Sequence, residues 1–267
     1  MKRILLGLSI AAVVAACATT TSPTGRTQRV GAVSQEQLDL MGAKAFAEAK
    51  SKQRLSGDAR QNAYVRCVVN SITRQLPQGW QASWDVALFV DDSPNAFALP
   101  GGKVGVNTGI FTVARNQDQL AAVIAHEIGH VVSRHHDERI TRQMGAQIGL
   151  GVLGGLVGAR YGEGMASTAN QLGGAALQTA FLLPGSRTQE TEADVVGQRL
   201  MAQAGYDPRQ AVNLWQNMIA ASTSRPPQWL STHPDPQSRI HELGARAGAL
   251  IPTYEQARAA GRTPKCG

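Results

Sequence analysis

The sequence has few cysteines, few aromatic residues, no dense run of basic residues and no long apolar run. Only 3 of its 267 residues are Cys, and aromatic residues make up 5%. The basic residues are scattered with few aromatics between them, which argues against a nucleic-acid-binding surface despite a formal net charge of +7. The apolar runs at residues 4–16 and 149–159 are both shorter than the roughly 20 residues that a transmembrane helix needs. Neither run is expected to span a bilayer.

The N-terminus is typical of an exported lipoprotein. A short basic head precedes the first apolar run, which is the layout of a secretory signal. Val14-Ala15-Ala16-Cys17 resembles the lipobox of bacterial lipoproteins, in which the signal is cleaved before the acylated Cys. Residues 1–16 are therefore expected to be a signal peptide and Cys17 the lipidated residue, followed by a flexible tether that completes residues 17–33. The alternative is an ordinary cleaved signal with an unmodified Cys. Ala18 rather than Asp follows the Cys, so the resemblance to lipoproteins implies the outer membrane, with the protein facing the periplasm.

Residues 34–267 are long enough to form one domain with its own core. Capping residues and apolar spacing predict helices around a small mixed sheet, so the expected fold class is α+β and mainly helical. The Gly- and Ala-rich residues 145–174 are compatible with close-packed helices, with a flap over the site or with a segment at a membrane surface. Helices are expected at about residues 34–53, 58–76, 116–132, 186–204, 207–221 and 235–249, and strands at 84–90, 96–98 and 103–107, the last two as a second hairpin.

His126-Glu127-Ile128-Gly129-His130 carries the most chemical information in the chain. It lies in a predicted helix, so the two histidines are one turn apart on one face and can bind one metal ion. Neutral imidazole is a good Zn²⁺ ligand, and two of them leave room for a third protein ligand and a water. Glu127 can take a proton from that water as a general base. The simpler alternative is a buried helix whose two histidines are only hydrogen-bonded.

The third ligand is expected on the helix that begins at Ser186. Glu190 is the best candidate, and Asp194, one turn further on, can accept the second ring N–H of a histidine ligand. Residue chemistry alone does not separate Glu190 from Glu192, which lies on a different face. Either carboxylate could instead be a solvated charge in the first turn of the helix.

These motifs resemble the HtpX and CAAX-prenyl-protease family of zinc metallopeptidases, which are gluzincins. The resemblance spans about residues 34–250 and is closest to the family's soluble periplasmic and lipoprotein branch, because no transmembrane helices are expected. The matching segments are His126–His130, Ser186–Asp194, Asn95–Gly102 and Thr232–Pro236 with Arg239.

The resemblance implies a zincin-type metalloendopeptidase that binds one Zn²⁺ per chain. It implies that Glu190 is the third ligand beside the two histidines. Asn95, Ala96 and Phe97 would belong to a strand that holds an extended substrate by strand addition.

The resemblance gives less definite roles to three further residues, Asp194, Arg239 and His233. Asp194 and Arg239 are expected to support the ligands. His233 either restrains activity at the metal or stabilises the oxyanion. The remaining alternative is a loop histidine that packs under Trp229.

The expected biological role is quality control in the cell envelope. Unfolded or misfolded outer-membrane or periplasmic proteins would be the substrates, the lipid on Cys17 would provide the membrane contact, and the outer-membrane assembly machinery is a possible partner. Two alternatives stay open: a zinc hydrolase of a non-peptide envelope substrate, and a latent chaperone-like or binding lipoprotein.

Two cysteines remain after Cys17. Export places Cys67 and Cys266 in an oxidising compartment, where a single pairing is possible. A disulfide would attach the C-terminal tail to the helix near residue 67.

Overall fold

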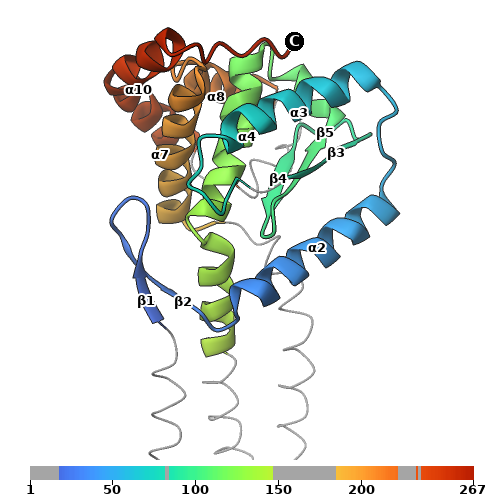
Figure 1. Ribbon diagram of the computed structural model, residues 1–267, viewed down its shortest axis with the longest axis vertical. Helices are drawn as coiled ribbons and strands as arrows, with labels where there is room; N and C mark the ends of the chain where they lie inside the picture. Colours follow the sequence, from blue (N-terminus) through green and yellow to red (C-terminus); the bar gives the residue numbers. More distant parts are fainter. Residues whose placement is uncertain (1–17, 82–83, 147–184, 222–232, 234–235) are drawn as a thin grey trace, which may run out of the picture. The chain divides into compact units, whose positions relative to one another are not determined.

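The computed structural model describes residues 18–81, 84–146, 185–221, 233 and 236–267 (Figure 1). These residues belong to two compact units, one within residues 1–38 and 134–183 and the other comprising residues 39–133 and 184–267. The predicted signal peptide, Cys17, Trp229 and most of the Gly-rich residues 145–174 lie outside the described residues. No helix in the described ranges is both long and apolar enough to cross a membrane.

The first unit contains a β-hairpin where the sequence predicted a flexible tether. Strands β1 (Ala18–Thr21) and β2 (Thr27–Val30) pair antiparallel around a turn that includes Gly25 at φ 89°. Three of the four residues in β1 are threonines, whose β-branched side chains favour strands. Arg26 forms two hydrogen bonds with Glu138, of 2.7 and 2.8 Å. This contact joins residues 112 positions apart, which local sequence patterns cannot reveal.

The second unit contains a three-stranded mixed sheet in the order β3-β5-β4. Strands β4 (Ala96–Leu99) and β5 (Lys103–Asn107) form the predicted hairpin, whose turn places Gly101 and Gly102 at positive φ, as glycine readily allows. Strand β3 (Asp85–Phe89) pairs in parallel with β5, so it is not a neighbour of β4 in the sheet. The expected fold class, α+β with a small mixed sheet, is confirmed.

The two faces of this sheet pack against different helices. Val86, Val104 and neighbouring side chains join the main core with α3 (Ala59–Thr73). On the other face, Phe46 of α2 (Gln35–Lys52) contacts the rings of Phe89 and Phe97 edge-on. The sheet is therefore covered on both faces.

Helix α4 (Gln117–Val132) occupies the centre of the second unit (Figure 1). It packs against α3, β4, α7 (Arg187–Ala204) and α8 (Gln210–Ala220), and α10 (Pro236–Ala259) packs against α7 and α8. Helix α10 continues about ten residues past its predicted end and includes Pro252. Ala247 and Ala257, on either side of that proline, are buried, so packing outweighs the local cost of a proline inside a helix.

Candidate metal centre and active site

Helix α4 brings His126 and His130 together. Asn116 caps the helix by accepting a hydrogen bond from the Gln119 backbone N–H at 2.9 Å. Leu120, Ile124 and the neighbouring apolar side chains are buried in the core. Both histidines are buried, and their Nε2 atoms lie 3.1 Å apart. The predicted spacing on one helical face is thus present in the structure.

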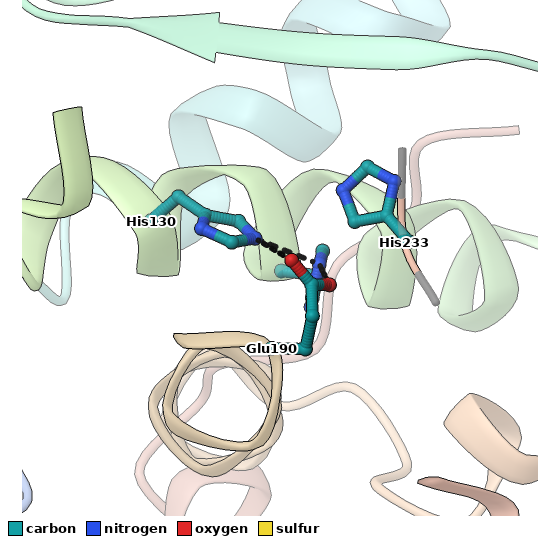
Figure 2. A group of neighbouring side chains, drawn as sticks. His130, Glu190 and His233 are labelled. Atoms are coloured by element: carbon teal, nitrogen blue, oxygen red, sulfur yellow. Dashed lines mark hydrogen bonds and ion pairs between the residues drawn. The ribbon is translucent and has the colours of Figure 1, made fainter. Parts of the chain in front are cut away.

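Helix α7 brings a carboxylate to the same point. Ser186 and Gln189 form the predicted capping box, which fixes the start of the helix. Glu190 follows in the first turn and is buried, with Oε2 lying 3.4 Å from His126 Nε2 and Oε1 lying 3.5 Å from His130 Nε2. Figure 2 shows the Glu190 carboxylate facing the His130 ring, with His233 beside them.

Two glycines allow α4 and α7 to approach this closely. A Cβ on Gly129 would lie 2.8 Å from the Ala193 carbonyl oxygen, and a Cβ on Gly197 would lie 2.8 Å from the backbone nitrogen of His126. Carbon atoms do not approach backbone atoms so closely without displacement. Glycine at both positions therefore sets the distance between the histidines and Glu190. No local pattern in the sequence indicates this role.

The donors fit a single zinc ion. Ligand atoms about 2.0–2.2 Å from a tetrahedral Zn²⁺ lie roughly 3.3–3.5 Å from one another. The three separations between His126, His130 and Glu190 are 3.1, 3.4 and 3.5 Å. Glu190 Oε1 is buried and accepts no hydrogen bond from the part of the chain that the structure describes, so a cation would satisfy it. Two imidazoles and one carboxylate, all common zinc ligands, therefore surround one point, so the chain can bind one Zn²⁺ there.

His233 belongs to the same cluster. It is buried, and its ring centroid lies 5.0 Å from that of His126 and 5.7 Å from that of His130. One donor atom each from His126, His130, Glu190 and His233 can be chosen so that all four lie within 4.8 Å of one another. The structure therefore places His233 at the metal position, where it can supply a fourth donor.

Glu127 lies beside this cluster with its carboxylate buried. Its Oε1 is 3.3 Å from His233 Nε2. Burial acts to raise the pKa of Glu127, but the interactions with His233, His126 and His130 outweigh burial and lower the pKa to about 2. The side chain is therefore ionised at neutral pH, which is the form that accepts a proton.

Asp194 and Arg239 form polar contacts with the donor residues His126 and Glu190. Arg239 Nε and Nη2 donate to the two carboxylate oxygens of Asp194 at 2.7 and 2.6 Å, and Nη1 donates to Glu190 Oε2 at 3.1 Å. Burial acts to raise the pKa of Asp194, but Arg239 and His126 hold it well below the usual range. The Arg239 guanidinium also lies 4.0 Å from the centroid of the Trp215 ring on α8. Neither this stacking nor the role of Trp215 was expected from the sequence.

The remaining predicted site residues lie elsewhere or outside the cluster. Glu192 is buried on α7 but is not among the clustered donors. Ala96 is buried in the core, and Phe97 packs against Phe46 and Phe89. Asn95 accepts a backbone hydrogen bond from Asn107 N–H. The side chains of Ala96 and Phe97 are therefore used in packing.

The two cysteines that follow Cys17 are joined. Cys67 on α3 and Cys266 form a disulfide across 199 residues. Gln117, the first residue of α4, donates to the Pro264 carbonyl and accepts from the Cys266 backbone N–H. The C-terminal tail therefore contacts the start of the helix that carries the two histidines, which the sequence did not reveal.

Comparison with known proteins adds independent findings. Peptidase family M48 matches residues 59–247, and the prokaryotic membrane lipoprotein lipid attachment site matches residues 1–18. Mitochondrial metalloendopeptidase OMA1 of Schizosaccharomyces pombe is 39% identical over 164 residues, which cover 60% of this chain and 45% of the relative. Beta-barrel assembly-enhancing protease of Yersinia pestis is 35% identical over 168 residues, or 61% of this chain and 34% of the relative. The same protease of Escherichia coli (strain K12) is 33% identical over 175 residues, or 63% and 35%. The chain thus matches less than half the length of each of these relatives.

Proposed function

The chain belongs to peptidase family M48, a family of zinc metallopeptidases, and from this premise we propose that it is a zinc-dependent endopeptidase of the bacterial cell envelope. Its proposed substrates are misfolded or stalled outer-membrane and periplasmic proteins. The lipoprotein attachment site supports attachment to a membrane through Cys17. The outer membrane, facing the periplasm, is the proposed location.

One observation carries this proposal: the buried carboxylate of Glu127 adjoins three clustered zinc-type donors. His126, His130 and Glu190 would hold the metal, and Asp194 with Arg239 would keep His126 and Glu190 in place. When bound, zinc supplies Lewis acidity for the scissile carbonyl and lowers the pKa of the attacking water.

The residues of the chain perform the proton transfers and position the substrate. Glu127 takes the proton from the attacking water and delivers it to the leaving amine. Strand β4 ends the sheet and packs against α4, so we propose that its backbone holds the substrate in an extended conformation. Such recognition depends on main-chain groups, which suits a protease that acts on many unfolded sequences.

The test is product analysis with two substrates. The chain from residue 18, loaded with zinc, is incubated separately with casein and with cross-linked peptidoglycan, and the products are identified by mass spectrometry. New peptide N-termini in casein support the proposal, and Glu127→Gln should produce them at least about 100-fold more slowly. Release of peptidoglycan fragments with intact casein would instead indicate the non-peptide hydrolase. Full cellular function of Glu127→Gln would indicate a chaperone-like or binding lipoprotein.

A further inference from the structure

Strand β3 forms the end of the sheet opposite β4, and its outer edge is only partly covered. The Ser56 backbone N–H donates to the Leu88 carbonyl at 2.8 Å, and the Val90 N–H donates to the Arg54 carbonyl at 2.8 Å. The chain then leaves this edge and enters α3. The short segment around residue 55 therefore covers only the C-terminal end of β3.

The Val86 side chain is buried in the core, and its backbone lies at the part of the edge that does not pair with the segment around residue 55. Asp85 donates its N–H to the Gly102 carbonyl, toward β5. Successive residues of a strand point their backbone groups in opposite directions, so Val86 points the same way as Leu88, away from the sheet. No hydrogen bond from the described portion of the chain reaches these Val86 groups. Such an edge can accept another extended chain.

A groove of about 410 Å³ lies along this edge. It is lined by Ala59, Asn62 and Arg66 of α3, by Lys50 and Leu55, and by residues of β3. The three α3 residues are spaced by three and four positions and therefore share one helical face. A helix face beside a partly unpaired strand edge is the geometry in which extended peptides bind by strand addition. We refer to this site as the β3 groove.

The charge of the β3 groove favours an acidic peptide. Lys50 is paired with Asp85 at 3.0 Å, so these two charges offset one another. The Arg66 side chain is exposed. Within the described ranges it forms no ion pair, and the same holds for Arg54 and Arg60. A carboxylate on a bound chain would neutralise the Arg66 guanidinium.

We propose that the β3 groove is a secondary binding site for an extended, acidic segment of a substrate polypeptide. The segment pairs with the Val86 backbone, and its carboxylates contact Arg66. This inference rests on the proposed protease function. The β3 groove shares no residue with the metal cluster, so binding there can be measured without cleavage.

The experiment measures fluorescence anisotropy of a labelled peptide of alternating valine and glutamate, titrated with the Glu127→Gln chain. Two control probes replace glutamate by lysine or carry N-methyl groups on alternate amides. Arg66→Glu should weaken binding of the acidic probe roughly threefold to tenfold, and the affinity should fall with added salt. Ala59→Phe should block the groove sterically. Arg60→Glu is the matched control, because it makes the same charge change on α3 outside the groove lining and should change the affinity less than about twofold.

The proposal predicts weaker binding of both control probes. Equal binding of the glutamate and lysine probes would overturn it, as would equal effects of Arg66→Glu and Arg60→Glu. Ala59→Phe could instead change self-association in sedimentation and leave peptide binding unchanged. That result would overturn the proposal and make a second copy of the chain the occupant of the groove. The Glu127→Gln chain is not expected to cleave the probe. If the probe does not bind to this chain, the result contradicts only the proposed groove. Probe binding with no casein cleavage by the wild type contradicts only the proposed function.

Discussion

His126 uses its two ring nitrogens for different contacts. Nδ1 lies 2.9 Å from Asp194 Oδ1, whereas Nε2 faces His130 and Glu190. Burial and the charge of Arg239 act to lower the pKa of His126, but hydrogen bonds to Asp194 and Glu190 outweigh them and raise it to about 9. A ring that donates from Nδ1 keeps the Nε2 lone pair for a metal. In the metal-free protein, a proton therefore competes with zinc at this ring.

The choice between Glu190 and Glu192 is tested by metal content. Glu190→Ala removes a carboxylate from the donor cluster, so we expect bound zinc to fall well below one per chain after dialysis. Glu192→Ala is the matched control on the same helix, and it should retain one zinc per chain. Plasma emission spectrometry measures both variants, and the opposite result would assign the third ligand to Glu192.

His233 should limit activity. A catalytic zinc keeps one position open for water or substrate, but four side chains can reach the metal position here. We therefore expect His233→Ala to cleave casein several-fold faster than the wild type while retaining zinc. A slower variant with normal zinc content would instead support stabilisation of the oxyanion by His233.

At the level of the elements, the sequence predicted local features well and contacts between elements poorly. Asn116 and Ser186 cap helices as expected, and Gly205 ends α7 at φ 86°. Capping depends on residues within one turn, so it can be inferred from sequence. The parallel pairing of β3 with β5 depends on a crossover, which no short motif specifies.

The same distinction applies to the site. The spacing of His126 and His130 placed both on one helical face, because that geometry is local. Residue chemistry did not separate Glu190 from Glu192, and only the family resemblance chose Glu190. Trp215 lies on another helix, and nothing in its neighbourhood in the sequence indicates that it stacks on Arg239.

The approach of α4 to α7 can be tested through Gly197. We expect Gly197→Ala to lower the free energy of unfolding by about 1–3 kcal/mol, because the added methyl group would contact the backbone of α4. Zinc affinity should fall as well, since Glu190 would move away from the histidines. Gly248→Ala on α10 is the matched control, because its Cβ would meet no atom within 4 Å. Thermal melts and zinc titrations measure both effects, and equal stability of the two variants would contradict this account of the helix packing.

At the scale of the whole molecule, the disulfide joins the last residues to α3. Cys67 and Cys266 are 199 residues apart, so the bond greatly restricts the unfolded chain. We expect Cys266→Ser to lower the free energy of unfolding by about 2–5 kcal/mol. Denaturant melts of wild type and variant, each with and without reductant, measure this difference. Reductant should destabilise the wild type but not the variant, and equal melts of the oxidised proteins would contradict the prediction.

The central claim is that this chain is a zinc endopeptidase in which Glu127 is the base. The most direct measurement determines zinc content and casein cleavage side by side, for the wild type and for Glu127→Gln, using the chain from residue 18. We expect one zinc per chain in both proteins and a loss of cleavage of about 10²–10⁴-fold or more in the variant. One bound zinc with equal cleavage by both proteins, or with no cleavage by either even after His233→Ala, would contradict the account.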